Sequence, residues 1–78
     1  MTYSDFLKFL IAGLVKNPEA IEITETEDTL GVLLTLKIAK DDMGNVIGKE
    51  GKTVNALRTI LRVVGSKDNK RLNLKIEE

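Results

Sequence analysis

Two glycines that enclose a charged pair, Gly48-Lys49-Glu50-Gly51, stand between two segments with helical character. The shorter segment covers residues 42–47, and the longer, amphipathic one covers residues 53–64. A chain that ends one helix and starts another within so few residues must turn sharply. Glycine supplies the positive φ angles of such a turn and lets a ligand approach the main chain. Because the turn directs helix ends and free backbone N–H groups at one place, it predicts a phosphate-binding loop.

Hydrophobic periodicity predicts further helices and strands on both sides of this loop. Apolar residues at i, i+3, i+4 and i+7 predict a helix over residues 3–16, which Asn17-Pro18 ends. Alternating apolar residues predict strands over residues 20–26, 32–39 and 71–76. The first two strands are expected to form a hairpin. The order helix–strand–strand–helix–loop–helix–strand predicts an α+β fold with three helices packed on one face of a three-stranded sheet.

Individual residues predict where these elements begin and end. Thr2 or Ser4 can cap the first helix, and Asp41 or Asp42 can cap the short helix before the loop. Gly65-Ser66 is expected to end the helix that follows the loop.

The composition limits both the size and the chemistry of this protein. Seventy-eight residues make one small domain, residues 1–78, whose core a partner subunit could supplement. Cysteine and histidine are both absent, which excludes disulfides, Ser-His or Cys-His catalysis and an ordinary zinc site. No other nucleophile–base pair or metal-binding pattern is evident, so we expect no enzyme, no cofactor and no small-molecule substrate.

The charge is unevenly distributed although its sum is zero. Residues 1–45 carry four lysines against eight acidic residues, a net charge of −4, whereas residues 46–78 carry eight basic against four acidic residues, a net charge of +4. This asymmetry favours a basic surface in the second half, around the loop, that could attract nucleic acid. The alternative is that these charges only solvate helix and strand surfaces.

Apolar runs are too short for a membrane span, which requires about 18 consecutive apolar residues. Residues 9–15 are apolar except for a glycine, but they lack the basic region before and the cleavage site after that mark a signal peptide. We therefore expect a cytoplasmic protein without a membrane partner.

The element order and the glycine loop together resemble the type II, prokaryotic KH fold over residues 3–77. The chain is especially similar to the small bacterial single-KH RNA-binding proteins of the KhpA family. The residues that carry this closer similarity are Asn17-Pro18, Asp42-Met43-Gly44-Asn45-Val46-Ile47-Gly48-Lys49-Glu50-Gly51-Lys52 and Asn69-Lys70-Arg71. A Gly-x-x-Gly alone recurs by chance, but here it follows Val-Ile, precedes a lysine and lies between two helices. KH loops of this kind clamp about four nucleotides.

The resemblance implies RNA-binding roles for residues in and after the loop. Phosphates would be held by the backbone of Gly48–Gly51 together with Lys49 and Lys52, whereas Glu50 opposes them and predicts modest, salt-sensitive affinity. The residues expected to bind RNA are Ile47, Gly48, Lys49, Glu50, Gly51, Lys52, Asn55, Arg58 and Arg62. Ile47 and Val46 would floor a groove for unstacked bases.

Other interpretations of the same residues remain open or are excluded. Val46 and Val54 fit a core role better than a groove role, and Ile47 fits both. Gly51-Lys52-Thr53 resembles the end of a P-loop, but Val46 stands where that motif requires glycine. An RRM or OB-fold would carry aromatic platforms on its strands, whereas the aromatic residues here lie among the first nine.

Two functions of different classes follow. The first is non-enzymatic binding of single-stranded RNA with low sequence specificity. The resemblance adds post-transcriptional regulation or RNA chaperoning linked to cell elongation and division, with a homodimer or a larger Jag-type KH protein as partner. The alternative is a protein-interaction module that binds little RNA. Ile60 and Val63 favour it, because they make the apolar face of the helix over residues 53–64 wider than packing on one sheet face requires.

Overall fold

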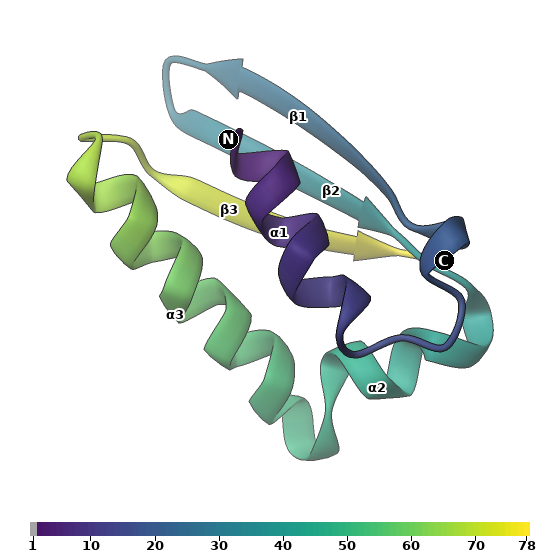
Figure 1. Ribbon diagram of the computed structural model, residues 1–78. Helices are drawn as coiled ribbons and strands as arrows, with labels where there is room; N and C mark the ends of the chain where they lie inside the picture. Colours follow the sequence, from purple (N-terminus) through teal and green to yellow (C-terminus); the bar gives the residue numbers. More distant parts are fainter. Residues whose placement is uncertain (1) are drawn as a thin grey trace.

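The computed structural model describes residues 2–78, which form three α-helices and three β-strands (Figure 1). In chain order the elements are α1 (Tyr3–Ala12), β1 (Glu22–Asp28), β2 (Gly31–Lys37), α2 (Met43–Ile47), α3 (Lys52–Lys67) and β3 (Leu72–Glu77). Three short 3-10 turns join them: η1 (Pro18–Ala20), η2 (Lys40–Asp42) and η3 (Lys49–Gly51). The order α-β-β-α-α-β confirms the predicted α+β, type II KH architecture.

The sheet has β2 at its centre and is mixed in direction. β1 pairs with β2 in antiparallel register, with Glu22 opposite Lys37, and β2 pairs with β3 in parallel register, with Val32 opposite Leu72. The parallel pair requires a crossover, which α2 and α3 supply. In Figure 1, α1 and α3 lie side by side over one face of this sheet, and α2 leads from β2 into the start of α3.

The hydrophobic core lies between the sheet and the helices. On β2 the side chains of Val32, Leu34 and Leu36 are buried, while the intervening Leu33 is exposed on the uncovered face. This alternation is the pattern of a strand with one covered face. Leu7 and Ile11 of α1 and Val54, Leu57 and Leu61 of α3 complete the core from the helical side.

The first helix is shorter than the predicted residues 3–16. Thr2 caps it, accepting a hydrogen bond from the Asp5 N–H and completing a capping box, so that part of the prediction is confirmed. The helix ends at Ala12 because the amides of Lys16 and Asn17, which a longer helix would use internally, donate instead to the carboxylate of Asp42.

Asp42 is therefore not the helix cap that the sequence suggested. Its side chain makes no capping bond to α2; it is fully buried and accepts from Lys16 N, Asn17 N and Asn17 Nδ2 at 2.9, 3.0 and 3.1 Å. These donors, the Lys16 amide foremost, favour the charged form and lower the pKa of the carboxyl. Asp42 thus fixes the segment after α1 to the segment that leads into the glycine loop.

The prediction that Gly65-Ser66 ends the third helix is wrong, because α3 continues to Lys67. Gly65 is buried inside the helix, and a Cβ at this position would lie 2.7 Å from Cγ of Leu72. Its carbonyl accepts the Lys70 N–H at 2.8 Å. Glycine is required here for close packing of α3 against the start of β3, and not to terminate the helix.

The strands also differ from their predicted limits by one or two residues at each end. β1 begins at Glu22, not at residue 20, because Pro18–Ala20 form a 3-10 turn. β1 extends to Asp28 and β2 begins at Gly31, so the turn between them has two residues and not the five, residues 27–31, that the predicted strands left. β2 ends at Lys37, two residues before the predicted end, and a second 3-10 turn begins at Lys40.

Candidate nucleic-acid interface

The glycine loop is a tight connection between α2 and α3. The Gly48 N–H donates to the Gly44 carbonyl at 2.9 Å and closes α2, and the Gly51 N–H donates to the Gly48 carbonyl at 3.1 Å. Gly48 adopts φ 77° and ψ 171°, and Gly51 adopts φ 76° and ψ 12°. Both conformations lie at positive φ, as predicted, and the one at Gly48 belongs to a region that essentially only glycine occupies.

The two glycines differ in what surrounds them. A Cβ on Gly48 would lie 2.6 Å from Cβ of Thr53 and 2.8 Å from its backbone nitrogen, so the α3 start already fills that space. A Cβ on Gly51 would meet nothing closer than 3.7 Å, where Nδ2 of Asn55 lies. The main chain at Gly51 is therefore the open side of the loop, where a ligand can approach.

The loop exposes unbonded amides beside basic side chains. Gly48 N and Gly51 N are both engaged, whereas the Lys49 and Glu50 amides donate to no loop or turn carbonyl of residues 2–78. They are the first two amides of η3, and the first amides of a helix have no partner within it. The side chains of Lys49, Glu50 and Lys52 are exposed. No side chain in the described part of the chain caps the start of α3, which leaves the positive end of its dipole open to an anion.

Glu50 is the unusual residue of the loop in conformation as well as in charge. It adopts φ 58° and ψ 26°, a left-handed conformation that is uncommon for any residue other than glycine, asparagine or aspartate. Its carboxylate stands between the basic side chains of Lys49 and Lys52 in sequence, and neither forms an ion pair with it among the described residues. The charge of Glu50 therefore opposes an anion at this loop.

Three further predicted site residues lie along one side of α3. Asn55, Arg58 and Arg62 recur at spacings of three and four residues, which places them in one row on the helix. Asn55 lies beside Gly51, and Arg58 Nη2 donates to the Leu74 carbonyl of β3 at 3.4 Å. The row thus starts at the loop and runs beside β3, whose outer edge is not covered by any other strand formed by residues 2–78.

The aliphatic residues before the loop divide between core and surface. Val46 and Val54 are buried, which confirms the core interpretation for both and removes Val46 from the surface of a groove. Ile47 is 37% exposed, so its side chain is accessible next to Gly48. Of Val46, Ile47 and Val54, only Ile47 is accessible for contact with a base.

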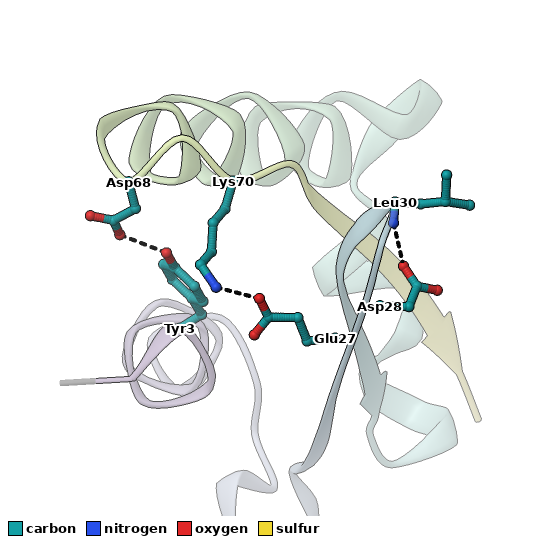
Figure 2. A network of polar contacts seen from close by, with 6 residues as sticks. All are labelled: Tyr3, Glu27, Asp28, Leu30, Asp68 and Lys70. Carbon is teal, nitrogen blue, oxygen red and sulfur yellow. Dashed lines mark hydrogen bonds and ion pairs between the residues drawn. The ribbon is translucent and has the colours of Figure 1, made fainter.

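A polar network that the sequence did not predict fixes the loop between α3 and β3 (Figure 2). The Tyr3 hydroxyl donates to Asp68 Oδ2 at 2.6 Å, and Lys70 Nζ pairs with Glu27. The hydrogen bond to the Asp68 carboxylate is the main cause that raises the pKa of Tyr3 to about 12. Through these contacts residues from α1, β1 and the α3–β3 loop meet, although they are far apart in sequence.

Other kinds of site find no support in the part of the chain that the structure describes. No group of three acidic residues there is arranged to hold a metal ion. None of the helices over residues 2–78 is long and apolar enough to cross a bilayer.

Comparison with known proteins identifies the family of this chain. The family model described as "KhpA/KhpB, KH domain" matches residues 4–76. The chain belongs to the KhpA/KhpB KH-domain family. Proteins named RNA-binding protein KhpA from Chlamydia caviae and Listeria monocytogenes are 43% and 41% identical over 74 and 69 residues. These alignments cover 95% and 88% of this chain, and 95% and 91% of the relatives.

A relative with lower sequence identity aligns over a similar share of the chain. The protein named RNA-binding protein KhpA from Caldanaerobacter subterraneus is 36% identical over 72 residues, which cover 92% of this chain and 96% of the relative. The comparison with solved structures gave no significant match. The KhpA/KhpB family is one of RNA-binding proteins by the names of these relatives, and not one of enzymes.

Proposed function

We propose that this protein is a non-enzymatic RNA-binding protein that grips short single-stranded RNA through Gly48-Lys49-Glu50-Gly51, with low sequence specificity. The observation that carries the proposal is the loop main chain. It offers two unbonded amides, at Lys49 and Glu50, next to the exposed ammonium groups of Lys49 and Lys52. Backbone amides and lysines recognise phosphate oxygens, which every nucleotide has, so the grip is insensitive to sequence. The names of the KhpA relatives support RNA as the ligand.

Bases would lie on the surface beside the loop. Ile47 offers an exposed aliphatic side chain on one side, and the amide group of Asn55 stands beside Gly51 on the other. The amide of an asparagine both donates and accepts hydrogen bonds, so it can pair with a base edge. Arg58 and Arg62 add positive charge farther along α3.

The affinity should be modest and depend strongly on salt. The loop brings two lysines and one carboxylate to the same place, and all three side chains are exposed to solvent. Exposed charges are screened within about 8 Å at physiological ionic strength. In the cell, such a protein would act in the cytoplasm in post-transcriptional regulation or as an RNA chaperone, in connection with cell elongation and division.

Fluorescence anisotropy with a mixed-sequence single-stranded RNA at two salt concentrations tests this proposal. The Lys49→Asp/Lys52→Asp variant should lose binding and keep its circular dichroism spectrum, since both side chains are exposed. The matched control is Lys8→Asp/Lys37→Asp, which makes the same charge change on α1 and on β2, away from the loop. Equal loss of binding in both variants, or no binding by the wild type at low salt, would refute the loop as the RNA clamp.

A second candidate function, protein interaction, rests on apolar residues that the fold leaves exposed. Ile60 and Val63, one turn apart on α3, are 39% and 61% exposed, and Phe9 on α1 is 72% exposed. Neighbouring apolar residues on one helix form a contiguous surface that a partner helix can cover. The partner would be a second copy or a larger Jag-type KH protein. A dimer would also present two weak RNA sites and gain affinity by linkage.

Light scattering coupled to size-exclusion chromatography tests this second candidate. Ile60→Asp should convert a dimer to a folded monomer, because Ile60 lies outside the buried core. Leu33→Asp is the matched control, since Leu33 is equally exposed but lies on the uncovered face of the sheet. A wild-type monomer at all concentrations, or dissociation by both variants, would contradict an interface at Ile60 and Val63.

A further inference from the structure

A hollow of about 620 Å³ lies between the end of α3 and the start of β3, at the end of α3 that is remote from the glycine loop. Six polar or basic residues contribute to its wall: Arg62, Ser66, Asn69, Lys70, Arg71 and Asn73. None of them is acidic. The hollow is therefore lined by hydrogen-bond donors and positive charge without a carboxylate to repel an anion.

The charges around the hollow favour an anion further. Lys70 is paired with Glu27, but Arg62 and Arg71 form no ion pair with any of residues 2–78. Asp68 is close in sequence, yet it lines an adjoining hollow beside the β1–β2 turn, which shares Asn69, Lys70 and Arg71 with this one. The Asp68 carboxylate is engaged by the hydroxyl of Tyr3. Two unpaired guanidinium groups thus remain on the side of α3 and β3.

This hollow continues the row of residues that starts at the loop. Ser66 follows Arg62 at the same four-residue spacing that relates Arg62 to Arg58, so the row reaches from Asn55 beside Gly51 into the hollow. Because an α-helix rises about 1.5 Å per residue, Arg62 lies roughly 16 Å along the helix axis from Gly51. The whole row is polar or basic.

We infer that the hollow binds a phosphate of the same RNA strand that the glycine loop grips, so that the strand contacts both ends of α3. Guanidinium groups bind phosphate oxygens in a bidentate manner, and the side chains of Ser66, Asn69 and Asn73 can donate to phosphate or to the ribose 2′-hydroxyl. A volume of about 620 Å³ is within the range of small-ligand pockets and admits one nucleotide. The RNA footprint then exceeds the roughly four nucleotides that a KH loop clamps. This inference rests on the proposed function of the loop.

A length series of oligouridylates, followed by amide chemical shifts of the ¹⁵N-labelled protein, separates the two contacts. A tetramer should shift the amides of residues 48–55 only, and an octamer should also shift those of residues 66–73. If the octamer shifts residues 48–55 and leaves residues 66–73 unchanged, the second contact is refuted and the proposed function stands. If neither set shifts with any oligouridylate, the proposed function itself fails.

Substitution of the two unpaired arginines tests the charge of the hollow. Arg62→Ala/Arg71→Ala should weaken octamer binding about tenfold and lower the slope of log affinity against log salt by roughly 1.4, since each phosphate contact of a single strand contributes about 0.7. Tetramer binding should weaken much less than octamer binding, since Arg62 also adds positive charge beside the loop site. Arg71→Ala alone, which changes only the hollow, should leave tetramer binding unchanged. The control Lys8→Ala/Lys37→Ala removes the same charge elsewhere, and Arg62→Lys/Arg71→Lys should retain most of the salt slope. Equal losses for tetramer and octamer, or for the hollow variant and the control, would overturn the inference.

Discussion

Replacement of Gly48 by alanine should destabilise the fold far more than the same replacement at Gly51. Gly48 has φ 77° and ψ 171°, a conformation that costs another residue about 1–3 kcal/mol. The new Cβ would also lie 2.6 Å from Cβ of Thr53, and such overpacking costs about 1–3 kcal/mol more. The sum is roughly 2–6 kcal/mol, out of a total stability of about 4–12 kcal/mol for a domain of this size.

Two other glycines serve as controls for this prediction. Gly51 also has positive φ, but the space beside it is open, so Gly51→Ala should cost only about 1 kcal/mol. Gly44 lies inside α2 with nothing within 4 Å of a new Cβ, so Gly44→Ala should stabilise the protein by about 0.5 kcal/mol. The expected order of stability is Gly44→Ala, wild type, Gly51→Ala, Gly48→Ala.

Urea unfolding followed by far-ultraviolet circular dichroism measures these differences. A shift of the midpoint at constant m-value reports a change in stability alone. For a domain of this size, 1 kcal/mol corresponds to roughly 4–8 °C in Tm, so thermal unfolding gives an independent check. If Gly48→Ala and Gly51→Ala are equally destabilising, the contact with Thr53 does not decide the requirement for glycine, and the reasoning is refuted.

Three further predictions concern charged or polar groups. Glu50→Asn removes the opposing charge and introduces a residue that tolerates φ 58°. RNA affinity, measured by fluorescence anisotropy, should therefore rise about threefold without loss of stability. Lower affinity would contradict an inhibitory role for Glu50. The pKa of Asp42 is below its ordinary value of 3.8, so the ionised carboxylate stabilises the fold above pH 3.8, and this contribution is lost as the pH falls through the lower folded-state pKa. The stability of Asp42→Asn, measured by acid unfolding, should therefore depend less on pH than that of the wild type. Identical unfolding profiles would refute this. The pKa of Tyr3 is raised from 10.0 to about 12, so the stabilisation by its hydroxyl is present below pH 10 and is lost as the pH rises towards 12. Tyr3→Phe should therefore be less stable than wild type at pH 8, and the difference in unfolding free energy should disappear at high pH. A difference that does not change with pH would contradict this prediction.

The sequence by itself determined the order of the elements and the position of the loop. Helix and strand periodicities are properties of neighbouring residues, so the alternation in β2 and the apolar stripe of α3 could be recognised without the fold. The same holds for Gly48 and Gly51, because a turn between two helices needs positive φ whatever surrounds it. The predicted site residues from Ile47 to Lys52 follow from this local signal, and their RNA contacts remain a prediction.

Only the tertiary structure decided which residues serve partners distant in the chain. Asp42 is a residue type that commonly caps helices, but its carboxylate accepts hydrogen bonds from amides 25 and 26 residues away. Gly65 has the appearance of a helix end, yet it is needed for contact with Leu72 across the α3–β3 turn. Tyr3 reaches Asp68 across 65 residues, and the hollow beside Arg62 forms only when β3 returns along α3. Such roles depend on packing between elements. The local sequence around a carboxylate or a glycine is the same whether its partner is a neighbouring residue or a distant strand, so the sequence does not show which partner it has.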